Sequence, residues 1–260
     1  MIKVHAHRGA SGYMPENTLP SFQMAHDVGS DGIECDIHRT ADGRFIVCHD
    51  TTLDRTSNGT GHICDMTVAD IQQYDFGSKV YYNKQPGATA PTLEEMLDVV
   101  KDMDPINIEV KAFAGDEEKA LNDFYDILVK YDCVERVLVS SFNVTLLGRL
   151  KALHPDLKTG YLYSANTHKN MLARGAEDPE FYLTFPPEDA LKTAKEQKCD
   201  AIHPSLAIMD AEKVAAAHEA GLQVNVWTVN TLKDVQRAID IGVDGIITNY
   251  PDWVKFYLNK

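Results

Sequence analysis

The chain has 260 residues, of which 44% are hydrophobic and 25% are charged, and its formal net charge is −14 at pH 7. This composition supplies ample apolar side chains for a folded core. The negative charge opposes general binding to nucleic acid or to anionic lipid surfaces, because such binding depends on Lys and Arg contacts to phosphate. No apolar run approaches the roughly 18 residues of a membrane-spanning helix, and the first residues lack the apolar stretch of a signal peptide.

The cysteines indicate the compartment. They are odd in number and contain no CxxC pair, so at least one thiol has no partner within the chain; they are Cys35, Cys48, Cys64, Cys133 and Cys199. Disulfides form in oxidising compartments, and an odd, scattered set is typical of a reducing one. We therefore expect a cytoplasmic protein.

Short β-rich runs alternate with amphipathic segments along the whole chain. Strands are expected at 2–7, 32–37 together with 45–49, 106–111, 136–141, 159–163, 200–204, 222–229 and 245–248. Helices are expected at 21–29, 91–97, 117–131, 145–154, 187–197, 210–221 and 232–242. Such alternation indicates parallel βαβ units. About eight of them in a chain of this length favour an α/β fold of the (β/α)8 TIM barrel type over an open sheet.

One segment departs from this alternation. Residues 50–91 are rich in Thr, Asn, Gly and Asp, and they contain a single short helical stretch at 67–76. The sequence GSDGIECD from Gly29 is echoed by GVDGIITN from Gly242, which supports repeated units over the rest of the chain. We therefore expect one domain, residues 1–260, with a small insertion at about 50–91 after the second strand.

Charged residues alternate on two of the expected strands. Glu34 and Asp36 share one face of the second strand, and Glu109 and Lys111 share one face of the next. Both faces of a parallel barrel strand are buried, so these charges must pair with each other, bind a cation or lie at the open mouth. A structural ion-pair network is one interpretation. The other is a site for one divalent cation, Mg²⁺ or Ca²⁺, because three converging carboxylates suit a hard cation better than zinc.

Histidines end two of the strands near the same mouth. His7 closes the first strand, and His49 closes the run at 45–49. Histidine is the side chain best suited to proton transfer near neutral pH. Arg8 offers a planar fork that suits phosphate. These residue types together indicate acid–base chemistry on a phosphorylated substrate.

Several other residues have two interpretations. Glu16 and Asn17 either cap the following helix or lie beside the ligand. Trp227 either forms an aromatic wall for a ligand or fills the barrel, and His203, which precedes a proline, is expected to be structural. The chain lacks GxSxG, P-loop, GxGxxG and HExxH patterns, which disfavours serine-hydrolase, nucleotide-binding and zinc-protease chemistry.

Five segments, taken in order, resemble the glycerophosphodiester phosphodiesterase family. They are HRGASGYMPENTLPSF, GIECDIHRTADGRFIVCHD, IEVK, VWTVN and DGIITNYPD, and the resemblance extends from residue 3 to about residue 252. It implies a barrel with a small insertion after the second strand and a bound divalent cation. It also implies hydrolysis of glycerophosphodiesters, such as glycerophosphocholine or glycerophosphoethanolamine, to an alcohol and glycerol 3-phosphate.

The resemblance also implies roles for individual residues. It assigns the metal ligands to Glu34, Asp36 and Glu109, the catalytic pair to His7 and His49, and phosphate contacts to Arg8 and Lys111. Glu16 matches a residue near the metal. One histidine would take a proton from the nucleophile while the other protonates the leaving alkoxide. The nucleophile is left open between water and the glycerol 2-hydroxyl, which would give a cyclic phosphate.

Three alternatives remain at this level. The sequence HAH at 5–7 resembles the HxH of metal amidohydrolases, but that class needs further histidines and an aspartate, and this chain supplies only His203. A noncatalytic barrel that binds a glycerophosphoryl group would lack part of the catalytic set. A lysophospholipase D-like preference would require an apolar channel near the mouth, for which Tyr81 and Tyr82 are candidates.

Overall fold

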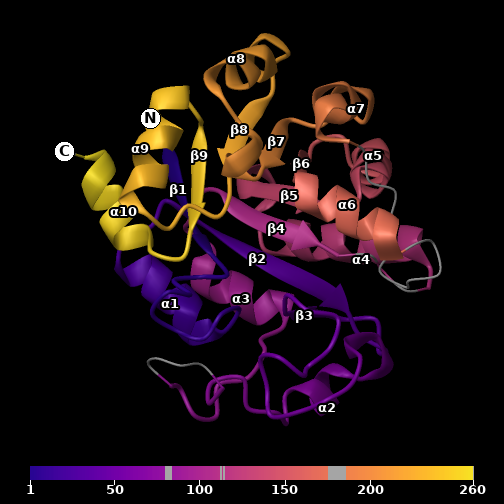
Figure 1. The fold of residues 1–260 in the computed structure, drawn as a ribbon. Coiled ribbons are helices and arrows are strands. Elements are labelled where there is room, and N and C mark those ends of the chain that lie inside the picture. Colours follow the sequence, from indigo (N-terminus) through magenta and orange to yellow (C-terminus); the bar gives the residue numbers. More distant parts are fainter. Residues whose placement is uncertain (80–83, 112, 114, 175–185, 260) are drawn as a thin grey trace.

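The computed structural model describes residues 1–79, 84–111, 113, 115–174 and 186–259. Within these residues eight parallel strands close into a barrel, because β1 pairs with β9 on one side and with β2 on the other (Figure 1). The strands are β1 (Lys3–His7), β2 (Gly32–Arg39), β4 (Ile106–Val110), β5 (Val137–Ser141), β6 (Lys158–Tyr163), β7 (Ala201–Pro204), β8 (Gln223–Val226) and β9 (Gly245–Thr248). The predicted barrel is confirmed.

Helices cover the outside of this barrel (Figure 1). They are α1 (Leu19–Asp27), α3 (Leu93–Val100), α4 (Glu117–Lys130), α5 (Val144–Leu153), α6 (Ala165–Arg174), α7 (Ala190–Glu196), α8 (Ala211–Glu219), α9 (Leu232–Ile241) and α10 (Pro251–Leu258). None of the described helices combines the length and the apolar character that crossing a membrane requires.

Helix α3 illustrates how sequence sets these elements. The Thr92 hydroxyl accepts a hydrogen bond from the Glu95 N–H, and the Glu95 carboxylate accepts one from the Thr92 N–H, so the helix begins at a reciprocal cap. Leu93, Met96 and Leu97 then fall on one buried face. Each such side chain contributes about 1.5–3 kcal/mol when fully buried, so packing against the barrel holds the helix in place.

The strands are buried on both faces but differ in polarity between them. On β4, Ile108 and Val110 belong to the apolar core, whereas Asn107 and Glu109 alternate with them on the other face. The interior of the barrel is filled by side chains: a Cβ on Gly160 would lie 2.6 Å from Nε2 of His203. His203 is fully buried there, and its Nε2 lies 3.0 Å from Nδ2 of Asn225. This buried, hydrogen-bonded position agrees with the structural role expected for His203.

The connection from β2 to β4 leaves the barrel and builds a core of its own. Strand β3 (Phe45–Val47) runs antiparallel to β2. The runs at 32–37 and 45–49, which were expected at one position in the series of strands, form two strands of opposite direction. A 3₁₀ turn at Ile63–Asp65 and helix α2 (Val68–Ile71) follow. The buried apolar cluster of this connection consists of Ile46, Cys48, Leu53, Ile63, Val68, Ile71, Phe76 and Ala90.

Helix α2 is shorter than the stretch 67–76 predicted from sequence. It has four residues, since the backbone turns after Gln72 and the Phe76 N–H donates to the carbonyl of Ala88. The cap is the strongest local signal, with Thr67 and Asp70 bonded reciprocally. Tyr81 and Tyr82 lie outside the described residues.

Candidate active site

Three carboxylates converge from two neighbouring strands of the barrel. Asp36 on β2 lies beside Glu109 on β4 in the pairing register, and Glu34 lies one strand repeat earlier on β2. One oxygen atom from each carboxylate can be chosen so that all three lie within 4.8 Å of one another, and all three side chains are buried. The convergence expected from strand alternation is therefore observed, and the donor set is entirely oxygen.

Burial and neighbouring charges shift the pKa values of the three carboxyl groups. Burial, reinforced by the neighbouring charge of Asp36, raises the pKa of Glu34 well above its ordinary value. Burial also raises the pKa of Glu109, although Lys111 opposes the change. Burial acts in the same sense on Asp36, but Lys111 and Arg8 outweigh it and bring the pKa of Asp36 well below its ordinary value. A divalent cation would relieve the repulsion, so these residues fit a hard metal ion.

Lys111 belongs to this cluster. Its Nζ lies 2.8 Å from Oδ1 of Asp36 and also pairs with Oε1 of Glu109. Burial would lower the pKa of Lys111, but these two carboxylates raise it, so the ammonium is charged. The ion-pair interpretation thus describes part of the contacts. One ammonium cannot balance three carboxylates, however, and the cluster needs further positive charge.

The loop between β1 and α1 supplies the next cation. Arg8 has a left-handed backbone with φ of 56°, a conformation that costs energy for a side chain other than glycine and that clusters at functional sites. This conformation directs the Arg8 N–H to Oε2 of Glu34 at 3.0 Å, while Nε lies 3.4 Å from Oδ2 of Asp36. Position 9 requires glycine, because a Cβ there would lie 2.4 Å from Oγ of Ser21.

Glu16 and Asn17 hold the cluster from the same loop. The Asn17 side chain donates to Oδ2 of Asp36 at 2.9 Å, and Glu16 accepts from NH1 of Arg8 at 2.8 Å. The capping interpretation is wrong for both residues, because the N-cap of α1 is Thr18. Asn17 can take this position because it adopts a left-handed backbone, with φ of 56°, that asparagine tolerates better than most residues.

His7 is oriented by the far end of the chain. Its Nδ1 lies 2.7 Å from Oδ1 of Asn249, and its Nε2 lies 3.9 Å from Oε2 of Glu34. Burial, with the Arg8 charge acting in the same direction, lowers the pKa of His7 to about 4. A neutral ring that donates Nδ1–H to Asn249 presents a free lone pair at Nε2. His7 can therefore accept a proton at that atom.

His49 is oriented by a carboxylate. Its Nδ1 lies 2.6 Å from Oδ1 of Asp50, which fixes Nε2 as the atom free for proton exchange. Arg55 holds Asp50 through Nε at 2.6 Å, and it also binds Glu16 through two nitrogens at 2.9 and 2.7 Å. Burial would raise the pKa of Asp50, but His49 and Arg55 bring it well below its ordinary value. One guanidinium thus ties the His49 loop to the Arg8 loop.

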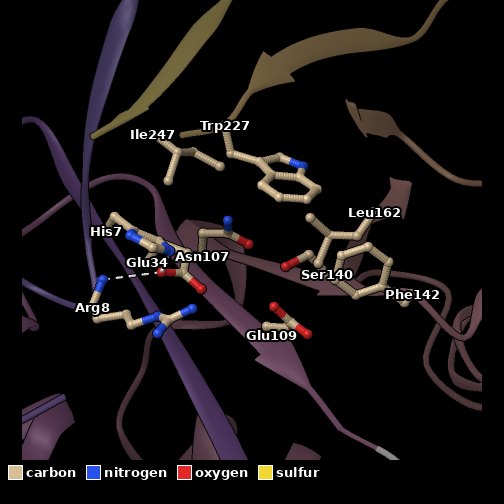
Figure 2. A pocket seen from close by; sticks show the side chains of 10 residues that line it. All are labelled: His7, Arg8, Glu34, Asn107, Glu109, Ser140, Phe142, Leu162, Trp227 and Ile247. Carbon is tan, nitrogen blue, oxygen red and sulfur yellow. Dashed lines mark hydrogen bonds and ion pairs between the residues drawn. The ribbon is translucent and has the colours of Figure 1, made fainter. Parts of the chain in front are cut away.

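A cavity of about 60 Å³ lies beside these groups and has two unlike sides. Figure 2 shows the charged side chains on one side and the apolar ones on the other. The lining residues are His7, Arg8, Glu34, Asn107, Glu109, Ser140, Phe142, Leu162, Trp227 and Ile247. Trp227 packs edge-on against Phe142 with centroids 5.7 Å apart, and its Nε1 donates to the His203 carbonyl at 2.7 Å.

Comparison with known proteins identifies the family. The sequence profile of the glycerophosphoryl diester phosphodiesterase family matches residues 7–253, which is nearly the whole chain. The chain belongs to this phosphodiesterase family. The matched range includes both histidines, the three carboxylates and the connection between β2 and β4.

Individual relatives agree with this assignment. A glycerophosphodiester phosphodiesterase of Caldanaerobacter subterraneus is 36% identical over 254 residues, which cover 96% of this chain and 94% of the relative. One from Bacillus subtilis is 35% identical, over 95% of this chain and 83% of the relative. The solved structure of an Oleispira antarctica phosphodiesterase in complex with the product sn-glycerol-3-phosphate has a TM-score of 0.84 at 28% identity, covering 99% of this chain and 97% of that one.

Sequence reasoning about this phosphodiesterase missed four polar residues of the site. Asn107 and Ser140 line the cavity, Asn249 orients His7, and Arg55 links Glu16 to Asp50. The alternation on β4 that pointed to Glu109 also places Asn107 on the same face, so that residue had a usable signal. Nothing local in the sequence connects Asn249 with His7, which lies 242 positions earlier.

Proposed function

We propose that this phosphodiesterase hydrolyses glycerophosphodiesters, such as glycerophosphocholine and glycerophosphoethanolamine, to an alcohol and glycerol 3-phosphate. The observation that carries the proposal is the buried carboxylate cluster, of which Glu34 and Glu109 line one cavity with Arg8 and His7. Family membership supports the reaction class. A small two-sided cavity suits a compact substrate that has one anionic end and one carbon-rich end.

Glu34, Asp36 and Glu109 would hold one divalent cation, Mg²⁺ or Ca²⁺, because their oxygens suit a hard ion. When bound, such an ion neutralises charge that develops on the phosphoryl oxygens. Asn17 and Arg8 keep the Asp36 carboxylate in place, and the Arg8 N–H does the same for Glu34. These contacts pre-organise the ligand set within the folded chain.

Arg8 and Lys111 would bind the phosphate. The guanidinium of Arg8 lines the cavity, and its planar set of donors matches phosphate oxygens. Lys111 lies next to it, held between Asp36 and Glu109. Both groups are permanently charged at neutral pH because the surrounding carboxylates raise their pKa values. They would bind the anionic substrate locally despite the net charge of −14.

His7 and His49 would move the protons. Each ring is held at Nδ1, by Asn249 and by Asp50 respectively, so each exchanges a proton at Nε2. One histidine removes the proton of the attacking hydroxyl, and the other gives a proton to the alkoxide as its bond to phosphorus breaks. Water or the glycerol 2-hydroxyl would serve as the nucleophile, and neither requires a nucleophilic side chain. In the second case the attack gives a cyclic phosphate, which water then opens to glycerol 3-phosphate.

Glu16 and Trp227 would serve the same site in different ways. Glu16 binds both Arg8 and Arg55, and it therefore fixes the direction of the phosphate-binding guanidinium. Trp227 lies on the apolar side of the cavity and would pack against the carbon skeleton of the substrate. The aromatic-wall interpretation of Trp227 is thus the one we propose.

We also propose that the protein acts in the cytoplasm. None of its five cysteines forms a disulfide, and four of them are buried. Thiols persist in reducing compartments, where glutathione and thioredoxin keep them reduced.

The proposed reaction can be tested by ³¹P NMR on glycerophosphocholine incubated with the purified protein and a divalent cation. We expect the diester signal to convert into that of glycerol 3-phosphate. Formation of phosphocholine would show cleavage of the other ester bond and would contradict the proposal. Binding without conversion would favour the noncatalytic alternative, and turnover of lysophosphatidylcholine alone would favour the lysophospholipase D-like one.

A further inference from the structure

Two uncharged polar side chains lie at the junction between the charged and apolar sides of the cavity. Asn107 comes from β4 and Ser140 from β5, and both are fully buried. Both line the cavity, together with Glu34 and Glu109 (Figure 2). They therefore lie where a bound molecule would pass from its anionic end to its apolar end.

These side chains have no partner of their own. Neither Oδ1 nor Nδ2 of Asn107, nor Oγ of Ser140, makes a hydrogen bond to any described residue. A buried polar group without a partner costs about 1–3 kcal/mol, so folded proteins nearly always satisfy such groups with protein, water or ligand. Asn17, by contrast, is also a buried amide of this site, and its Nδ2 donates to Oδ2 of Asp36 at 2.9 Å.

The chemistry of the pair selects its ligand. An amide and a hydroxyl both donate and accept hydrogen bonds and carry no charge, which matches alcohol O–H groups. An anionic phosphate would instead be drawn to Arg8, on the charged side of the same cavity. We infer that Asn107 and Ser140 form a hydroxyl-binding subsite that holds the glycerol hydroxyls of the phosphodiester.

The surroundings agree with a short polyol chain. Leu162 and Trp227 line the cavity on the apolar side, where they can contact C–H groups, while Asn107 and Ser140 take the hydroxyls. This inference rests on the proposed function, since it adds recognition of the glycerol half to a site for phosphodiesters. It makes the enzyme selective for glycerol among alcohols esterified to the same phosphate.

Substrate discrimination tests the subsite. The variants Ser140→Ala and Asn107→Ala are compared with wild type on glycerophosphocholine and on bis(p-nitrophenyl) phosphate, which has no glycerol hydroxyl. Loss of one neutral hydrogen bond should lower kcat/KM for glycerophosphocholine, relative to kcat/KM for bis(p-nitrophenyl) phosphate, roughly three- to tenfold in each variant. The matched control is Thr159→Val, which removes a buried hydroxyl on β6 that does not line the cavity. Its ratio should equal that of wild type.

Three outcomes would overturn the inference. An unchanged ratio in both variants would mean that the pair binds only water. An equal change in Thr159→Val would mean a general packing effect. If weaker metal binding accounted for the whole change of the kcat/KM ratio in Asn107→Ala, the Asn107 amide would be a metal ligand instead.

Calorimetry separates the inference from the proposed function. Glycerol 3-phosphate and inorganic phosphate are each titrated into wild type and Ser140→Ala. A selective weakening of glycerol 3-phosphate, by roughly three- to tenfold, supports the subsite even if wild type hydrolyses no diester. Equal affinities of the two proteins for glycerol 3-phosphate would contradict it, whatever the activity.

Discussion

The two sides of the cavity differ in origin and in chemistry. The charged side comes from β1, β2 and β4 and from the loop after β1, and it contains the groups proposed for the reaction, such as Arg8 and Glu109. The apolar side comes from the later strands and includes Leu162 and Trp227. Under the proposed function, one half of the barrel mouth performs the chemistry and the other binds the carbon skeleton of the substrate. Changes on the charged side should lower kcat, and changes on the apolar side should raise KM.

Removing a carboxylate of the cluster should have the largest effect. Glu109→Gln keeps the shape of the side chain but removes a charged oxygen, so we expect weaker metal binding and a loss of activity of about a thousandfold, equivalent to about 4 kcal/mol. Metal titration calorimetry and steady-state kinetics measure the two effects. Glu212→Gln, at an exposed position of α8, is the control. Full metal affinity in Glu109→Gln would contradict the proposed role of Glu109 as a metal ligand.

Removing either histidine should be the next largest change. His7→Ala and His49→Ala should each lower kcat by roughly a hundredfold, at the lower end of the usual contribution of a positioned acid or base. Metal binding should persist, since neither ring is needed for the oxygen donor set. His62→Ala, at an exposed position of the connection between β2 and β4, serves as the control. Near-normal turnover by His7→Ala would rule out its proposed role.

Arg55 tests whether the connection between β2 and β4 supports the charged side. Arg55→Ala frees both Glu16 and Asp50, so kcat should fall by about ten- to a hundredfold, as for other residues that orient functional groups. Added guanidinium should restore part of the rate, whereas sodium chloride at equal ionic strength should not. Arg44→Ala is a matched control, because Arg44 is 48% exposed against 47% for Arg55 and pairs with one carboxylate. Unchanged kcat in Arg55→Ala would show that the bridge is dispensable.

The apolar side should give the smallest effect and a different signature. Trp227→Leu removes apolar contact area, so we expect KM to rise by roughly tenfold while kcat changes much less. Trp227→Phe keeps an aromatic ring but loses the hydrogen bond to the His203 carbonyl. Its KM should lie between those of Trp227→Leu and wild type. Initial rates over a range of glycerophosphocholine concentrations separate the two constants. A fall in kcat with constant KM would place Trp227 in the chemistry instead.

The contrast between the two sides also explains what the sequence could predict. Charged residues are rare within a buried parallel strand, and those two positions apart share one face of it. Glu34, Asp36 and Glu109 could therefore be singled out before the structure was known. Leu162 has the pattern of any core residue, and nothing in the sequence separates it from its neighbours. The carboxylates of the charged side were therefore predictable, whereas on the apolar side only Trp227 was singled out.

Contacts between distant segments set a second limit. The barrel followed from the alternation of strands and helices, and a strand was expected at 45–49. Its antiparallel pairing with β2 as β3 was not predicted, because alternation within a strand does not show the direction in which it pairs. The Asn249 contact to His7 and the Arg55 bridge depend on how loops fold back over the mouth. Local patterns carry no information about such contacts, and the three-dimensional structure is needed to find them.

The most direct test of the central claim is metal-dependent release of glycerol 3-phosphate from glycerophosphocholine. The purified protein is stripped with a chelator and assayed, and then assayed again after Mg²⁺ or Ca²⁺ is added in excess. We predict that the stripped protein releases no glycerol 3-phosphate and that at least one of the two ions restores release. Full activity in the stripped protein, or no release with either ion, would contradict the account of the carboxylate cluster as the centre of a glycerophosphodiester phosphodiesterase.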